Sequence, residues 1–463
     1  MIIKNGLVFN EDTGFEQGDL CVHVYPHTTE YSDNSVIDAE GMYVIPGLID
    51  IHTHGCVGHD FCAADADGLR AMSSYLYSAG VTGFCPTSMT FNEEKLSDVY
   101  SSAAEYVAGN PETGQKQAAD SKQEKDRMQE TDRKQEADRM QEVDRKQAAD
   151  RKPTAGQKQE SFRKQEADQK QESGKTPTAD ILGINMEGPF ISLKKCGAQN
   201  TQFIQAPDVG MFERLQKKAN GLIRLVTLAP EAEGAMEFID AVSGGSAVNY
   251  SPDEGNIHIG VSHEGSAHCC ALAPHISLGH TEADYDTCMK AFGKGCDHVT
   301  HICNGMSAFN HREPGLIGAA ADSSDVFAEV ICDGIHIHPA MFRSLYKMFG
   351  PDRLILISDS LECAGMPDGK YNLGGQEVFK SGMRATLADG TLAGSCVNLF
   401  QCFRNAVNFG VPLEDAVKMA AVNPARSIGL GDVTGSLKKG CRGGVLILDK
   451  QLNLIRVVKG IIG

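Results

Sequence analysis

The feature that most constrains the fold is a regular alternation of short apolar runs with segments of helical periodicity. Eight apolar runs have the length and composition of buried strands, at Tyr43–Asp50, Gly83–Thr87, Ile181–Met186, Leu222–Ala229, His275–Gly279, His298–Thr300, Phe327–Ile331 and Leu354–Ser358. Helical periodicity lies between several of them, over Ala66–Ala79, Ala283–Lys294 and Pro339–Phe349. Eight units of a strand followed by a helix predict an α/β protein with a (β/α)8 TIM-like barrel, which we place at residues 46–370.

The two ends of the chain have a different pattern, with short strand-like runs separated by turn residues. Residues 1–45, 371–395 and 433–463 therefore predict a small β-sandwich that is built from both termini. Between the last two pieces, residues 396–432 include a helical segment at Leu413–Ala421. We expect this segment to pack on the barrel.

A polar, repetitive block interrupts the barrel pattern at residues 110–178. Its centre repeats the hexapeptides DRMQET, DRKQEA, DRMQEV and DRKQAA from Asp126 onward. Six residues leave successive repeats rotated by about 120° on a helix, so no apolar stripe can persist. The block holds 16 Lys+Arg and 15 Asp+Glu, a net charge of +1. We interpret it as a near-neutral, low-complexity insertion, disordered or solvated, on the barrel face opposite the carboxyl ends of the strands.

Composition excludes several classes of protein. A net charge of −18 argues against binding to nucleic acid or to an anionic membrane surface. No apolar run is long enough to span a bilayer, and the first residues lack the pattern of an export signal, so we expect a cytoplasmic protein. The 15 cysteines include no CxxC pair, which favours reduced thiols over a disulfide framework.

Ionisable side chains gather where the predicted strands end. They are His52 and His54 at the first strand, Glu187 at the third, His280 at the fifth, His301 at the sixth, His336 after the seventh and Asp359 at the eighth. The carboxyl ends of all strands of a barrel meet at one rim, so these side chains are expected to face one cavity.

The spacing of His52 and His54 is that of a shared strand face. Alternate residues of an extended strand point the same way, so both imidazoles can reach one ion. Imidazole and carboxylate together favour Zn²⁺, with Fe, Mn or Co as alternatives, over Ca²⁺. The sequence therefore predicts a divalent metal centre and leaves open whether one or two ions bind.

Six motifs carry a family resemblance. They are Val44-Ile-Pro-Gly-Leu-Ile-Asp-Ile-His52-Thr-His54-Gly, Glu187-Gly-Pro-Phe, Gly279-His280-Thr-Glu-Ala, His301-Ile-Cys-Asn304-Gly-Met, Arg312-Glu-Pro-Gly and Leu392-Ala-Gly-Ser. The first resembles the amidohydrolase superfamily, and the combination resembles the N-acetylglucosamine-6-phosphate deacetylases. The resemblance covers the chain except for the polar block, a Gly/Ser-rich loop at 243–270 and the last strands.

The resemblance implies a reaction and a set of metal ligands. The reaction would be metal-dependent hydrolysis of the acetamide of N-acetyl-D-glucosamine 6-phosphate to D-glucosamine 6-phosphate and acetate, in amino-sugar catabolism. Glu187, His280 and His301 would bind the metal that is common to the family. His52 and His54 would add a second metal site.

The resemblance also implies the remaining roles. Asp359 would take a proton from the attacking water and return it to the leaving amine; a helix N-cap is the ordinary alternative for this residue. The substrate would contact Ala198, Gln199, Asn304, Gly305, Arg312, His336, Leu392, Ala393 and Gly394. In this family the counterpart of Arg312 reaches across a dimer interface, which implies a homodimer.

Gln199 departs from the family pattern, because members usually have histidine at this position. Glutamine can donate and accept hydrogen bonds but cannot carry charge, so substrate preference is open to change. Another N-acyl amino sugar or a cyclic amide therefore stays an alternative substrate. A vestigial barrel that uses the polar block as a partner-binding arm is another alternative. Deletion of residues 110–178 distinguishes the two hypotheses: the enzyme hypothesis predicts a nearly unchanged kcat, and the arm hypothesis predicts the loss of a partner.

Overall fold

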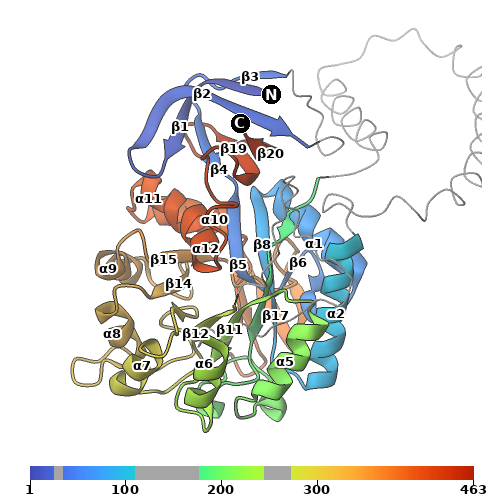
Figure 1. Ribbon diagram of the computed structural model, residues 1–463, viewed down its shortest axis with the longest axis vertical. Helices are drawn as coiled ribbons and strands as arrows, with labels where there is room; N and C mark the ends of the chain where they lie inside the picture. Colours follow the sequence, from blue (N-terminus) through green and yellow to red (C-terminus); the bar gives the residue numbers. More distant parts are fainter. Residues whose placement is uncertain (26–34, 110–176, 244–272) are drawn as a thin grey trace, which may run out of the picture. The chain divides into compact units, whose positions relative to one another are not determined.

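The protein is described from a computed structural model (Figure 1), which places residues 1–25, 35–109, 177–243 and 273–463. The described residues, all but 107–109, fall in one compact unit. The polar block up to residue 176 and the Gly/Ser-rich loop from residue 244 lie outside the described residues. No described helix is long and apolar enough to cross a membrane.

Eight parallel strands form the barrel, as predicted. In spatial order they are β5 (Leu48–Thr53), β8 (Val81–Ser88), β10 (Ile184–Glu187), β11 (Ile223–Leu228), β12 (His275–Leu278), β13 (His298–Val299), β14 (Phe327–Ile331) and β15 (Leu354–Ile357). A short extra strand, β9 (Asp180–Ile181), pairs with β8. A parallel bridge between Thr53 and Ser360 connects the ends of the first and eighth barrel strands. The fold class predicted from the strand and helix pattern is confirmed.

Helices connect the described strands. They are α1 (Ala66–Ser78), α2 (Glu93–Gly109), α5 (Val209–Lys218), α6 (Ala235–Ser243), α7 (Tyr285–Phe292), α8 (Gly315–Asp322) and α9 (Pro339–Phe349). The start of α9 follows from its sequence: the His338 side chain accepts a hydrogen bond from the backbone N–H of Ala340, and Pro339 occupies the first turn. Phe342, Leu345 and Phe349 recur at helical spacing and are buried, which fastens the helix to the barrel.

The predicted first strand is in fact two strands that belong to different sheets. β4 (Tyr43–Pro46) pairs within the terminal sheet, and β5 begins after Gly47 in the barrel. A Cβ on Gly47 would lie 2.1 Å from Oγ1 of Thr82, so only glycine permits this close approach. The apolar run alone could not reveal the break, because both halves are buried.

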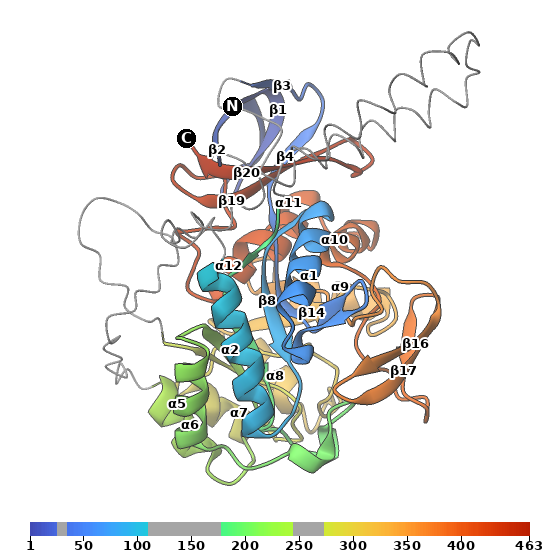
Figure 2. The same ribbon diagram turned by 90° about the vertical axis from the view of Figure 1, so that its right-hand side faces the viewer.

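Both termini build one sheet (Figure 2), in the order β2 (Gly14–Val24), β20 (Leu454–Ile462), β19 (Arg442–Leu448), β4, β1 (Ile2–Asn10) and β3 (Val36–Asp38). Strand β1 also pairs with β2, so the sheet closes on itself as a small barrel instead of forming two stacked layers. Its core includes Ile3, Val22, Val44, Ile447 and Val458, which come from both ends of the chain. The expectation that the termini fold together is confirmed.

Residues 371–395 do not join this terminal sheet, so that part of the prediction is wrong. Strands β16 (Gly369–Leu373), β17 (Gln376–Ser381) and β18 (Arg384–Thr386) pair only with one another in a separate antiparallel sheet. The reason is connectivity. The terminal sheet leads into the start of β5, whereas this segment leaves the barrel after the carboxyl end of β15, at the opposite rim.

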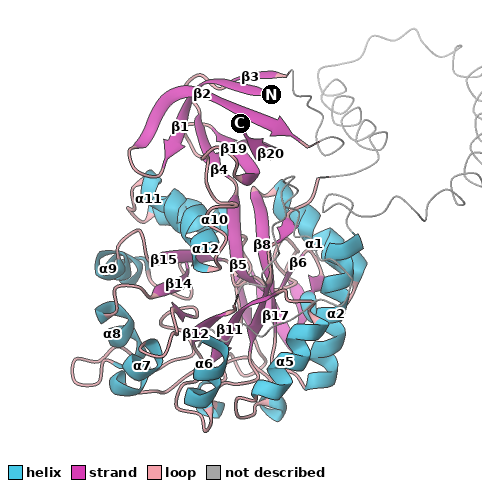
Figure 3. Cartoon of the chain, viewed as in Figure 1, coloured by secondary structure: helices cyan, strands magenta, loops and turns pink. Residues whose placement is uncertain are grey.

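The segment that follows is helical (Figure 3) and consists of α10 (Leu399–Asn408), α11 (Leu413–Val417), a π-helical turn (Lys418–Val422) and α12 (Asn423–Ser427). The helix predicted over Leu413–Ala421 is therefore interrupted at Lys418. Ala425, Ile428 and Leu430 belong to the same buried apolar cluster as residues of β5, β8, β11, β14 and β15. Through this cluster the helical segment packs on the barrel.

Candidate active site

Three candidate residues directly follow barrel strands and have an unusual backbone. The φ angles of His280, His301 and Asp359 are +47°, +27° and +48°, in the left-handed region that few non-glycine residues adopt. Such strain persists only where the surrounding structure enforces it, and it concentrates at functional sites. These turns direct all three side chains toward the pocket at the strand ends.

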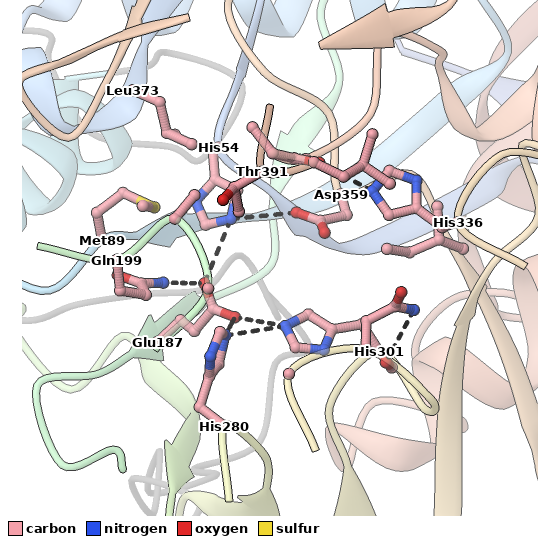
Figure 4. A pocket seen from close by; sticks show the side chains of 18 residues that line it. His54, Met89, Glu187, Gln199, His280, His301, His336, Asp359, Leu373 and Thr391 are labelled. Atoms are coloured by element: carbon pink, nitrogen blue, oxygen red, sulfur yellow. Dashed lines mark hydrogen bonds and ion pairs between the residues drawn. The ribbon is translucent and has the colours of Figure 1, made fainter. Parts of the chain in front are cut away.

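Glu187 lies at the centre of the first candidate ligand set (Figure 4). Its Oε1 is 3.0 Å from Nε2 of His280 and 2.9 Å from Nε2 of His301, and the two Nε2 atoms are 3.1 Å apart. The Nδ1 of His280 donates to the carbonyl of Lys195 at 2.7 Å, which leaves its Nε2 free to bind an ion. The three residues are at most 6% exposed.

His52 and His54, at the end of β5, form the second candidate ligand set. The Nε2 of His54 lies 3.4 Å from Glu187 Oε2, and that of His52 lies 3.7 Å from Glu187 Oε1. Each Nδ1 has a partner of its own, the carboxylate of Glu329 at 2.9 Å for His52 and the carbonyl of Thr87 at 3.1 Å for His54. Buried His52 Nε2 has no hydrogen-bond partner among the described residues, as expected of a ligand atom.

Asp359 faces the second set from the end of β15. Its Oδ1 lies 3.2 Å from His54 Nε2 and 3.7 Å from His52 Nε2. Burial opposes its charge, yet the hydrogen bond from His54 and the charges of the nearby histidines hold the pKa of its carboxyl below the usual range. Asp359 is therefore ionised at neutral pH, the form that accepts a proton.

The electrostatics of the site call for a cation. Burial disfavours the charged form of His54, but the carboxylates of Asp359 and Glu187 raise its pKa to about 9. The same competition raises the pKa of His52 and of His280 and lowers that of Glu187. No lysine or arginine is among the residues that line this pocket in the described part of the chain. A divalent ion would displace the protons of these histidines and take their place as the positive charge beside the carboxylates, and the side chains of the two candidate ligand sets fit such an ion.

The pocket above the two ligand sets has a volume of about 320 Å³. Most of the substrate-contact residues expected from the sequence line it: Ala198, Gln199, Asn304, Gly305, His336, Leu392, Ala393 and Gly394. A Cβ on Gly394 would lie 2.6 Å from the carbonyl oxygen of Asp359, so this glycine allows the Leu392–Gly394 loop to pack on the proposed acid/base residue.

His336 is held at the pocket by both ring nitrogens. Nδ1 lies 2.7 Å from the carboxylate of Asp333, and Nε2 lies 2.8 Å from the carbonyl oxygen of Ala393. Both partners are acceptors, so both nitrogens donate. Burial opposes the charge, but the bond to Asp333 raises the pKa of His336. His336 therefore brings a positive charge to a pocket that has no lysine or arginine among its described lining residues.

Gln199 is engaged with protein groups at both ends of its amide. Its Nε2 donates to Glu187 Oε2 at 2.7 Å, and its Oε1 accepts from the backbone N–H of Thr90 at 2.7 Å. The side chain lines the pocket but is 5% exposed. In this structure it orients the central carboxylate of the site.

Replacement of Gln199 by leucine is therefore expected to weaken metal binding about 10- to 100-fold, because the orientation of Glu187 is lost. The metal-free protein should also lose about 1–3 kcal/mol of stability, since the Thr90 N–H becomes unpaired. Competition with a chromogenic chelator and thermal unfolding measure the two effects. Unchanged affinity in the leucine variant contradicts the orienting role.

Arg312 is not brought into this pocket. It lies in an exposed stretch, 308–313, and lines a different surface hollow with Asn310 and Glu313. Phe309 in the same stretch is 48% exposed. Within one chain, Arg312 does not accompany the other residues predicted to contact substrate.

Several residues at the site were not assigned from the sequence. Met89, Gly197, Ile331, Leu373 and Thr391 also line the pocket. Glu329 bonds to the candidate ligand His52, and Asp333 bonds to the pocket residue His336. Glu329 carried a signal that could have been used, because it is an acidic residue inside the apolar run Phe327–Ile331.

Comparison with known proteins agrees with this geometry. The model of the amidohydrolase family matches residues 171–461. An N-acetylglucosamine-6-phosphate deacetylase of Bacillus subtilis (strain 168) is 30% identical over 458 residues, which cover 99% of this chain and 92% of the relative. An N-acetylgalactosamine-6-phosphate deacetylase of Escherichia coli O157:H7 is 34% identical over 282 residues, 61% of this chain and 67% of the relative.

A solved structure is similar over the whole chain. It is an N-acetyl-D-glucosamine-6-phosphate deacetylase mutant of Mycobacterium smegmatis in complex with N-acetyl-D-glucosamine-6-phosphate. The TM-score is 0.73 at 26% identity, and the match covers 100% of this chain and 98% of that one.

Proposed function

We propose that this chain, which belongs to the amidohydrolase family, hydrolyses the acetamide of N-acetyl-D-glucosamine 6-phosphate to D-glucosamine 6-phosphate and acetate. The observation that carries the proposal is the meeting of Glu187, His280 and His301 with Asp359 in one pocket. The named activities of the relatives from B. subtilis and M. smegmatis support the choice of substrate.

We assign the metal to the two ligand sets that share Glu187. Glu187, His280 and His301 would hold one divalent ion, and His52 and His54 with Glu187 would hold a second. Nitrogen and carboxylate ligands favour Zn²⁺, with Fe, Mn and Co as alternatives. Such an ion, when bound, supplies Lewis acidity that polarises the amide carbonyl and acidifies a water molecule.

The protein's own proton carrier in this scheme is Asp359. Its ionised carboxylate accepts the proton of the attacking water and then returns that proton to the amide nitrogen as the C–N bond breaks. An amine leaves readily, whereas an unprotonated amide nitrogen would leave as a strong base. The position of Asp359 beside His54, on the face of the site that holds the second ligand set, supports this role.

The phosphate end of the substrate needs positive charge. His336, whose two N–H groups bond to Asp333 and to Ala393, provides one positive charge, and Asn304 and Gly305 provide neutral groups in the same pocket. Arg312 is exposed beside Phe309, outside the pocket of its own chain. We propose that a homodimer brings Arg312 of the partner subunit to the phosphate, where its planar guanidinium suits phosphate oxygens.

Acetate release tests the proposed function. The purified, metal-loaded chain should release acetate from N-acetylglucosamine 6-phosphate and much less from N-acetylglucosamine without the phosphate. N-acetylgalactosamine 6-phosphate belongs in the same assay, because the E. coli relative is named for that sugar. Absence of acetate from every phosphorylated sugar contradicts the proposal, even if the protein binds metal.

Arg312→Ala is expected to raise KM for the phosphorylated sugar by about 10- to 100-fold with little change in kcat, since one charge-assisted phosphate contact is worth about 1.5–3 kcal/mol. A mixture of Arg312→Ala and Asp359→Asn chains should regain activity, because a mixed dimer combines an intact Asp359 pocket with an intact Arg312. Steady-state kinetics before and after subunit mixing measure both effects. If size and tag analysis shows that mixed dimers have formed and activity still does not recover, the active site is not shared between subunits.

A further inference from the structure

A carboxylate lies inside the barrel directly beneath the metal ligands. Glu329 sits on β14 between buried Ala328 and Val330, and its own exposure is 0%. A buried carboxylate loses its hydration, which destabilises the fold unless specific partners compensate it. Glu329 does not line the substrate pocket, so its partners must lie within the protein.

Those partners are two metal-ligand residues from other strands. Oε2 of Glu329 lies 2.9 Å from Nδ1 of His52 and accepts from the backbone N–H of His301 at 3.2 Å. Glu329, on the seventh barrel strand, thus contacts one residue of the first strand and one that follows the sixth. Its Oε1 has no hydrogen-bond partner among the described residues.

The contact with Glu329 decides which nitrogen of His52 is free. A carboxylate oxygen accepts this hydrogen bond, so in the neutral imidazole, the form that binds a metal, the proton resides on Nδ1 and the lone pair resides on Nε2. That Nε2 is the buried, unpartnered atom that faces Glu187 Oε1 and Asp359 Oδ1, each at 3.7 Å. Carbonyl oxygens hold His54 and His280 in the same way, so His52 alone of these three has a charged support.

We infer that Glu329 is a positioning residue of the metal centre, which fixes the tautomer and ring orientation of His52 and strengthens His52 as a ligand. The inference rests on the proposed metal centre but not on the identity of the substrate. Loss of such a supporting partner weakens metal binding by about 10- to 100-fold in comparable sites. The contact to His301 is through its backbone, so the set of Glu187, His280 and His301 should be affected less.

The test compares metal binding by the full chain and by its Glu329→Gln variant. Glutamine preserves the size of the side chain and removes the charge. The metal-free proteins are titrated with Co²⁺, whose visible absorption reports each binding step, and metal content is measured by elemental analysis. One of two binding steps should weaken about 10- to 100-fold in the variant. Thr227→Val serves as the matched control, because Thr227 is equally buried in the barrel and its hydroxyl bonds to Thr300.

A second background shows whether Glu329 acts through His52. In His52→Asn, whose amide can still donate to the carboxylate, the further change Glu329→Gln should cause no additional loss of Co²⁺ affinity. Wild-type affinity in Glu329→Gln, or an equal loss in both backgrounds, overturns the inference. If acetate release fails while the metal effects appear, the proposed function is wrong and the positioning role stands.

The inference remains testable if Glu329→Gln does not fold. NMR spectra of the histidine-labelled, metal-loaded chain are compared with and without His52→Asn. Among the imidazole Nδ1–H signals of the unmodified chain, one should be missing from the spectrum of the variant. A His52 ring that carries its proton on Nε2 contradicts the assignment.

Discussion

Asp359→Asn is expected to lower kcat for acetate release about 10²- to 10⁴-fold, with KM nearly unchanged. Asparagine has almost the same shape as aspartate, so packing against Gly394 and the hydrogen bond with His54 can persist. The amide cannot take up a proton from water, and the amine therefore cannot be protonated as it leaves. Steady-state kinetics with the phosphorylated sugar and elemental analysis of the same preparation provide the measurement.

A matched control separates chemistry from stability. Asp297 is also paired with two histidines, with Nδ1 of His275 at 2.6 Å and Nδ1 of His298 at 2.7 Å, but it precedes β13 at the opposite end of the barrel. Asp297→Asn should lower the thermal midpoint and leave kcat within a few-fold of the wild type. If Asp359→Asn keeps both its metal and its kcat, Asp359 is not the proton carrier.

Glu187→Gln is expected to remove most of the bound metal and to lower acetate release by about three powers of ten or more. Glu187 is shared by both ligand sets, with Oε1 toward His280 and His301 and Oε2 toward His54. A metal ion contributes several kcal/mol to the transition state of amide hydrolysis, and each 1.36 kcal/mol is about tenfold in rate. Dialysis of the wild-type protein against a chelator should cause a loss of the same order.

Restoration distinguishes metal loss from misfolding. Activity of the stripped wild-type protein should return with Zn²⁺ or another divalent transition metal, whereas Glu187→Gln should not respond at the same concentrations. Glu282→Gln is the control, because Glu282 lies near the strand ends and its side chain pairs with Lys194 at the surface. Full metal content and activity in Glu187→Gln would contradict the assignment of Glu187 as the central ligand.

Prediction from sequence was most successful where the pattern is local. The alternation of apolar and helical segments predicted the barrel, and the helix Pro339–Phe349 has the predicted bounds because its cap, its proline and its apolar spacing are contiguous. The prediction was wrong at residues 371–395, where strand character was recognised but pairing partners were not. A strand pattern does not specify its neighbour, since every exposed strand edge offers the same backbone donors and acceptors.

The candidate site shows the same division. Strand-end positions alone predicted the groups that meet at the pocket, because parallel strands of a barrel bring their carboxyl ends to one rim. Gln199 was expected to contact substrate, but in the structure both ends of its amide bond to Glu187 and to Thr90, which is 109 residues away. No spacing rule relates residues at such a separation.

By itself, the sequence determined the barrel, the union of the termini and the types of ligand available, since these follow from periodicity and from the position of side chains along strands. Only the tertiary structure decided which ring nitrogen of these histidines is left to bind a metal. Glu329 and His52 are 277 residues apart and meet at 2.9 Å only because the seventh and first strands both face the interior of the barrel. A hydrogen bond forms only when donor and acceptor lie about 3 Å apart, and it engages a single ring nitrogen. Which nitrogen that is depends on distances in the folded chain, which the sequence does not state.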